Sequence, residues 1–216
     1  MVAGRVYVAM IAKNTGTGTR SFSCADDGAG GTPNTWGNYA ESAGTNVNRA
    51  AVTACICTSA GSVTVTLSVS GGTTSGTWQI FEVIPASGTL AIGGTSFFDD
   101  SGVTTSHQCA ASSGFSPAAD SAILGVGAGT TGASFGTPTA SGSYSLAAGS
   151  SNVFAVFTQS TSSLLTNETI PWTSSVSRQC RGAAIYVTET AATSNGPVFG
   201  RGRTFDNSRI FGGSVL

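Results

Sequence analysis

The side chains that could do chemistry are few in this chain, and His107 is its only histidine. A Ser-His-acid triad could in principle recruit it as a general base. Its neighbours, Thr105-Ser106-His107-Gln108, are instead typical of an ordinary polar strand or loop. We therefore expect this histidine to have no catalytic role.

Adjacent carboxylates occur twice, at Asp26-Asp27 and at Asp99-Asp100. Glycoside hydrolysis uses two acids held about 5–10 Å apart, but neighbouring residues rarely point the same way. Because Asp26 and Asp27 precede a glycine-rich turn, we predict that their side chains bind turn amides. A calcium ion held by this loop is the alternative.

One further carboxylate, Glu82, lies within the most apolar segment of the chain, Trp78-Gln79-Ile80-Phe81-Glu82-Val83-Ile84. An unpaired carboxylate would be costly there, so the sequence predicts a partner such as an arginine or a backbone amide. We expect an orienting role for Glu82 and no catalytic one.

The five cysteines are odd in number and form no Cys-x-x-Cys pair. They lack the clustered ligands that a zinc site needs, so we predict buried, reduced thiols and neither a metal nor a cofactor. Cys55 and Cys57 stand two apart in an expected strand, which places both thiols on one face, poorly oriented to bond each other. Reduced thiols fit assembly in a reducing cytoplasm.

The composition also argues against an enzyme. Only 9% of the residues are charged, 40% are apolar, and 30 are glycine. A formal charge of −1 provides no field that would attract nucleic acid or a membrane surface. The first twelve residues lack the pattern of a secretory signal, and no apolar run approaches the roughly 20 residues of a membrane span.

Alternation of apolar and polar residues predicts strands, most clearly in Ser62-Val63-Thr64-Val65-Thr66-Leu67-Ser68-Val69. The other expected strands are 5–12, 20–25, 50–58, 77–84, 121–128, 152–158 and 183–188. Glycine-rich stretches at 27–31, 70–72, 93–94, 128–132 and 148–151 indicate turns between antiparallel strands. Short helices are expected only around 117–120 and 160–165. The predicted fold is all-β, an antiparallel two-sheet β-sandwich of jelly-roll-like form.

Two expected strands, 78–84 and 153–157, are apolar on both faces. Such strands are central, with one face in the core and the other against a loop or a neighbouring subunit. We therefore expect an oligomer.

The last part of the chain differs in composition from the rest. Residues 196–216 contain three arginines and one aspartate, a formal charge of +2, which leaves −3 for residues 1–195. Its large apolar residues are spaced by glycine, a pattern that neither forms a helix nor folds alone. We predict a β-sandwich domain at 1–192 and an extended docking arm at 193–216.

Aromatic anchors with interleaved arginine are enriched in binding hot spots, so we expect the arm to lie on another subunit or partner. A frayed terminus and a return onto its own sheet are the alternatives. The residues expected to contact the partner are Phe199, Arg201, Arg203, Phe205, Arg209, Ile210, Phe211 and Leu216.

The order of several segments resembles that of a known family. The segments are Phe22-Ser23-Cys24-Ala25-Asp26-Asp27-Gly28, Asn34-Thr35-Trp36, 50–57, Gly61-Ser62-Val63-Thr64-Val65-Thr66-Leu67 and Trp78-Gln79-Ile80-Phe81-Glu82-Val83. They are similar to β-sandwich modules of tailed-bacteriophage virion proteins and bacterial surface proteins, with an Asp-x-x-Gly-Asn-Thr/Ser-Trp/Tyr turn before the later strands. The likeness spans about residues 18–190, and this chain inserts Gly30-Gly31-Thr32-Pro33 into the turn.

The resemblance implies a non-enzymatic virion structural protein, made in the host cytoplasm and placed on the capsid exterior. Among such proteins it is most similar to capsid decoration or cement proteins, which are commonly trimers that bind across capsomer boundaries. The implied partners are the major capsid protein or another virion protein, with further copies of this chain. The alternative is a receptor- or glycan-binding module of a phage tail or fibre, which predicts exposed aromatics such as Trp36 or Trp172.

Overall fold

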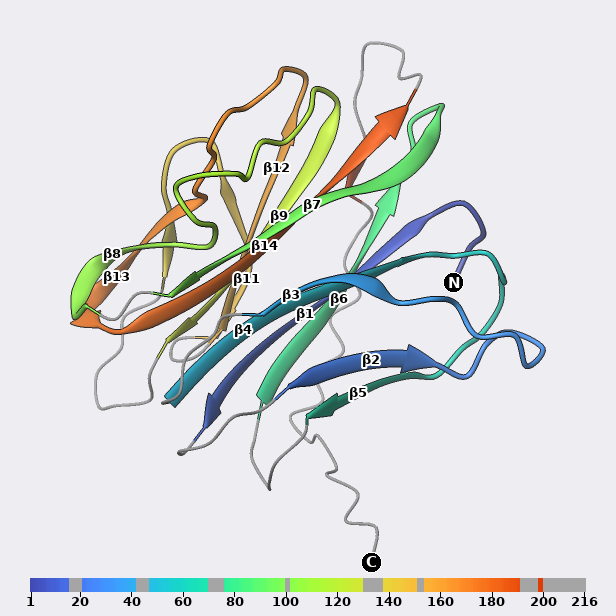
Figure 1. The fold of residues 1–216 in the computed structure, drawn as a ribbon, viewed down its shortest axis with the longest axis horizontal. Helices are drawn as coiled ribbons and strands as arrows, with labels where there is room; N and C mark the ends of the chain where they lie inside the picture. Colours follow the sequence, from blue (N-terminus) through green and yellow to red (C-terminus); the bar gives the residue numbers. More distant parts are fainter. Residues whose placement is uncertain are drawn as a thin grey trace, which may run out of the picture.

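The computed structural model describes residues 1–15, 21–41, 47–69, 76–99, 102–129, 138–150, 154–190 and 198–199. Over these residues the chain is all-β, and every strand pairing is antiparallel. Figure 1 shows the strands arranged in two large sheets and two small ones. No helix occurs in the described ranges, so none there could span a membrane.

The first large sheet has five strands in the order β15-β6-β1-β4-β3. Its strands are β1 (Val6–Thr15), β3 (Gly37–Glu41), β4 (Val47–Ile56), β6 (Gly76–Ile84) and β15 (Val198–Phe199). Apart from β15, this sheet comes from the first 84 residues.

The second large sheet also has five strands, in the order β11-β12-β9-β14-β7. Its strands are β7 (Thr89–Asp99), β9 (Ser121–Gly129), β11 (Ser145–Ser150), β12 (Phe154–Thr161) and β14 (Cys180–Thr190). The connection from β6 to β7 carries the chain from the first large sheet to the second (Figure 1).

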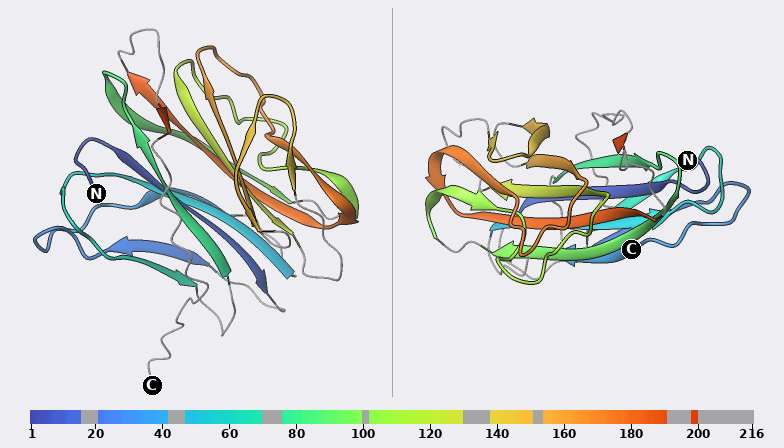
Figure 2. Two further views of the ribbon diagram at one scale, coloured as in Figure 1. Left: turned by 180° about the vertical axis from the view of Figure 1, so that it is seen from behind. Right: turned by 90° about the horizontal axis from the view of Figure 1, so that it is seen from above.

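Two small sheets complete the fold. One pairs β2 (Phe22–Asp26) with β5 (Val65–Val69), and the other joins β10 (Thr139–Ala140), β13 (Pro171–Arg178) and β8 (Thr104–Gln108). Figure 2 shows the same elements from behind and from above.

The two large sheets share the main hydrophobic core. Alternate residues of their strands meet in one cluster, because successive side chains of a strand point to opposite faces. Its buried members include Val8 and Met10 of β1, Val52 of β4, Leu124 of β9 and Ile185 of β14.

The small sheets cover the outer faces of the large ones. Ile11 of β1 and Trp78 of β6 pack with Phe22 and Leu67 of the β2–β5 pair. Phe157 and the neighbouring outer-face residues of the second large sheet pack in the same way against the three-stranded sheet. The two-sided apolarity of 78–84 and 153–157 is thus satisfied within the chain, and it no longer argues for a neighbouring subunit.

All eight strands expected from the sequence are present, although their bounds differ by a few residues. The expected helices around 117–120 and 160–165 are wrong, since 117–120 are loop and turn and β12 continues through Thr161. A helix of only one or two turns is marginally stable in water, so segments this short do not form a helix on their own.

Two glycine stretches expected to be turns lie within strands. Gly93 and Gly94 are part of β7, where a Cβ on Gly93 would overlap the ring of Tyr186. Their missing side chains therefore make room for an aromatic ring across the sheet, where the β7–β14 register also shifts. Gly149 lies in β11.

Candidate functional site

Asp26 is the centre of a buried hydrogen-bond network at the end of β2. Its carboxylate accepts hydrogen bonds from the backbone amides of Gly28 (2.9 Å) and Asn34 (3.0 Å), the Asn34 side chain (3.2 Å) and the Trp36 indole (2.8 Å). Burial alone would raise the pKa of Asp26, but these hydrogen bonds outweigh it and hold the pKa below its usual value. The prediction that this carboxylate binds turn amides is confirmed.

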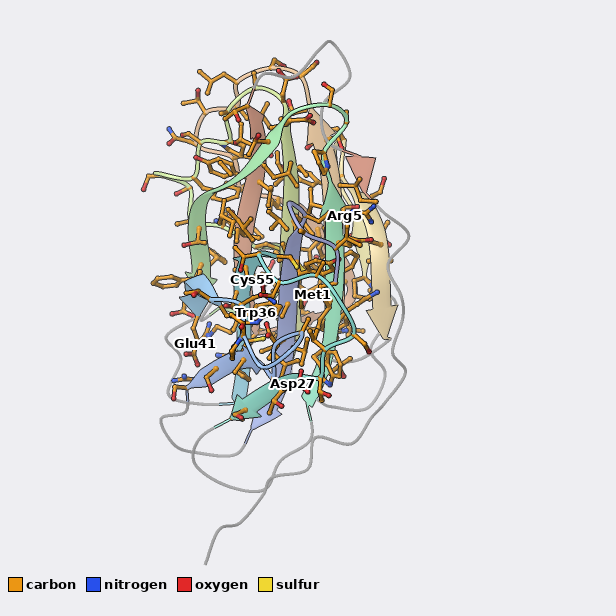
Figure 3. The ribbon with its side chains drawn as sticks, turned by 90° about the vertical axis from the view of Figure 1, so that its right-hand side faces the viewer. Met1, Arg5, Asp27, Trp36, Glu41 and Cys55 are labelled. Carbon is orange, nitrogen blue, oxygen red and sulfur yellow. The ribbon has the colours of Figure 1, made fainter. Side chains whose placement is uncertain are left out.

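Asn34 links this network to the first residues of the chain. Its side-chain oxygen accepts hydrogen bonds from the amides of Thr58 (2.9 Å) and Ser59 (3.2 Å), and its amide nitrogen lies 3.5 Å from the sulfur of Met1. The terminal ammonium of Met1 donates to the carbonyl of Gly61 at 2.5 Å. Figure 3 shows Met1 close to Trp36 and Cys55, with which it packs.

The partner expected for Glu82 is Arg5. The Arg5 guanidinium lies 2.9 Å from Oε1 of Glu82, and the hydroxyl of Tyr7 donates to the same oxygen at 2.5 Å. The amide of Val2 donates to that hydroxyl at 2.7 Å. Burial raises the pKa of Glu82, but its bonds to Tyr7 and Arg5 reverse this and bring the pKa below its ordinary value. The prediction of an arginine partner is confirmed.

The sequence analysis missed a third structural carboxylate, Glu189 of β14, which is buried. It accepts hydrogen bonds from three successive amides in the β6–β7 connection, those of Ala86 (2.9 Å), Ser87 (2.7 Å) and Gly88. Burial would raise its pKa, but the amides keep the pKa below the usual value. Because about a hundred residues separate donors and acceptor, no local pattern could have indicated this contact.

Two further carboxylates, Glu41 and Asp99, form ion pairs with arginines. Arg49 of β4 pairs with Glu41 of β3, and both side chains are largely buried. Burial raises the pKa of Glu41 more than Arg49 lowers it. Asp99, which was considered for glycoside hydrolysis, lies 3.2 Å from Nε of Arg181, whereas Asp100 lies outside the described residues.

His107 is a buried residue of β8 opposite Trp172 of β13, and the two ring centroids lie 4.5 Å apart. Its Nε2 lies 2.8 Å from Oγ of Ser174, and that hydroxyl donates its own proton to the carbonyl of Val176 at 2.8 Å. The serine oxygen therefore accepts from the histidine. This is the reverse of nucleophile activation, in which the histidine takes the serine proton.

The sequence contains a Gly-x-Ser-x-Gly pattern at 132–136, which the expectation for His107 did not take into account, and it lies outside the described residues. In hydrolases this pattern stands between a strand and a helix. The described ranges contain no helix that could provide that setting.

All five cysteines are free thiols; Cys55, Cys57, Cys109 and Cys180 are buried as predicted, whereas Cys24 is only partly buried. Burial raises the pKa of Cys55 to about 12. No group of metal-binding side chains was found among the described residues. Trp172 is 2% exposed, so the expectation that it could lie on a glycan-binding surface is wrong.

The residues predicted to bind a partner lie mostly outside the described residues. This holds for Arg201, Arg203, Phe205, Arg209, Ile210, Phe211 and Leu216. Phe199 belongs to β15, which pairs with the end of β6 through Val198–Ile84 and Phe199–Val83. The last described residues, Val198 and Phe199, therefore lie at the edge of the first large sheet.

No family model matches this chain, and comparisons with curated proteins and with solved structures find no match either.

Proposed function

We propose that this chain is a non-enzymatic structural protein of a tailed-bacteriophage virion, most specifically a capsid decoration protein on the head exterior. The observation that carries the proposal is the structural use of its carboxylates. Asp26 and Glu189 accept hydrogen bonds from the amides of turns and connections, and Glu82, which is half-buried, accepts them from Arg5 and Tyr7 at the start of β1. Acids held in this way maintain a shape and offer no pair for acid–base work.

The architecture supports the same role. We infer that the two large sheets form a β-sandwich, because one apolar cluster draws on strands of both. The jelly-roll connectivity stays a prediction, as four of the first six strands fill one large sheet before the chain enters the other. A β-sandwich of this kind can bear mechanical force without a conformational change.

The partners would be the major capsid protein or another virion protein, together with further copies of this chain in a trimer. The part of the arm beyond β15 would bury apolar and arginine side chains on a neighbouring subunit. Each arm then adds contact area across a seam between capsomers, and several arms per particle act together through avidity.

The test is co-sedimentation with virions. A tagged full-length chain and one lacking residues 196–216 are produced in the infected host, and DNA-filled particles are purified on a density gradient. We expect the full-length chain in the particle band and the shortened chain, still folded by circular dichroism, at the top. Equal amounts of both in the particle band would contradict the role of the arm.

Loss of both chains from the particles, with retention on host-cell polysaccharide, would favour the glycan-binding alternative. Replacing Trp36 with alanine would then remove the polysaccharide binding. In the structure Trp36 is half-buried, and its indole nitrogen donates a hydrogen bond to Asp26.

A further inference from the structure

The edge of β6 is only partly covered. On one side β6 pairs with β1 along its length, from Gly76–Lys13 to Val83–Val6. On the other side, among the described residues, β15 pairs with Val83 and Ile84 alone. On that second side, the stretch from Gly76 to Glu82 therefore has no described strand beside it.

This edge lacks the features that protect open strands. Natural proteins block such edges with lysine, proline or bulges, since free backbone groups would otherwise pair with another chain. The open stretch of β6 contains neither lysine nor proline, and its single charge, Glu82, is bound by Arg5 and Tyr7. An edge of this kind is open to pairing with a further strand.

The residues that follow β15 have the length and pattern to supply it. Continuing the antiparallel register brings Gly200 opposite Glu82, Gly202 opposite Ile80 and residue 206 opposite residue 76. Seven arm residues, 200–206, thus match the seven open positions of β6.

The alternation of side chains fits the two faces of the sheet. Val83, which pairs with Phe199, is a residue of the main core, so in a continued register every second arm residue would share that side of the sheet. These residues are Arg201, Arg203 and Phe205. At the edge of a sheet an arginine can pack its aliphatic chain on apolar surface and extend its guanidinium to solvent. In this register the glycines at 200 and 202 would lie on the other side, where no side chain would displace the Glu82 ion pair.

We propose that the arm works in two parts, with residues 198–206 as an anchor strand that covers β6 of its own chain and residues 207–216 as the docking tip. The tip retains Arg209, Ile210, Phe211, Val215 and Leu216, a basic and apolar set suited to a protein surface. This division deepens the proposed virion role and rests on it, but the anchor can be tested without any particle.

The first test is a disulfide crosslink in the full-length chain. Cross-strand neighbours on one face lie close enough for a disulfide, so Ile80→Cys combined with Gly202→Cys should crosslink on mild oxidation. The matched control combines Ile80→Cys with Arg203→Cys, one position along the arm and on the opposite face. The unsubstituted chain and the Ile80→Cys single variant serve as blanks for the five native thiols.

We expect the first pair to form a crosslink within a single chain, mapped by mass spectrometry of chymotryptic peptides, and the control pair to remain reduced. A crosslink found only between two chains would mean that the arm is exchanged with a second copy, and it would overturn the anchor. Equal crosslinking of both pairs, or of neither, would overturn it as well.

The second test compares chains that end at residue 206 and at residue 197. The longer one should keep the Tm of the full chain but lose particle binding, and the shorter one should also lose stability. Equal destabilisation of both would refute the anchor, and particle binding by the 1–206 chain would refute the tip. If the full chain itself binds no particle, the virion role fails, while the Tm comparison still judges the anchor.

Discussion

At the scale of single residues, the ionisable groups of this protein act as connectors. Asp26 organises a turn, Glu82 holds the first residues of the chain, and Glu189 ties β14 to the β6–β7 connection. Each carboxylate has a pKa below its ordinary value because hydrogen-bond donors favour the charged form.

Replacing Asp26 with alanine should destabilise the protein strongly. The change leaves the Asn34 amide, the Trp36 indole and their neighbours without their acceptor, at a cost of about 3 kcal/mol in unfolding free energy. The matched control is Asp27→Ala, which removes one exposed hydrogen bond to Thr64 and should cost less than about 1 kcal/mol. Urea unfolding measures both, and equal losses would contradict the central place given to Asp26.

Glu189→Gln should remove part of the pH dependence of stability. Because the folded-state pKa of Glu189 is lowered, its contribution is fully present above the unfolded value of about 4.3 and is lost as pH falls through the folded value. At pH 7 the variant should be less stable by about 2 kcal/mol. As the pH falls below about 4.3, the difference in unfolding free energy between the variant and the unchanged protein should shrink, and a constant difference would refute the charged amide contact.

At the scale of elements, the sequence predicted strands where apolar and polar residues alternate or where a short run is apolar on both faces. It missed, among others, β7, β8 and β13, for which local alternation is weak. The Gly93-Gly94 pair suggested a turn in β7, although the ring of Tyr186 occupies that space. In β8 and β13 the residues are mostly threonine, serine and other polar types, and their burial depends on the sheet beneath them.

The packing of the three-stranded sheet on β14 predicts a sharp difference between two glycines. A Cβ on Gly182 would overlap Cα of Cys109 and lie 2.5 Å from the carbonyl oxygen of Gln108, both backbone atoms that cannot rotate away. Gly182→Ala should therefore cost about 2 kcal/mol or more. At Gly37 a Cβ meets nothing within 4 Å, so Gly37→Ala should change stability by less than about 0.5 kcal/mol. Similar Tm values for the two variants would show that the layers are not packed this closely.

At the scale of the whole molecule, how much of the structure can be predicted from the sequence depends on how far apart in the chain two interacting residues lie. The Asp26 turn and the need of Glu82 for a cation follow from local chemistry and burial. The amides bound by Glu189 and the outer layers that cover 78–84 and 153–157 come from distant segments. The unusual composition of residues 196–216 can be seen in the sequence. Only the structure shows that Val198 and Phe199, near the start of that segment, pair with β6.

The central claim is that this chain contributes contact surface to a virion and transforms no substrate. The most direct measurement is an image reconstruction of intact phage particles that carry the full-length chain. The account predicts density for the β-domain on the head exterior, at the boundaries between capsomers, with an arm reaching a neighbouring subunit. Heads without that density, from a phage that produces the chain, would contradict it.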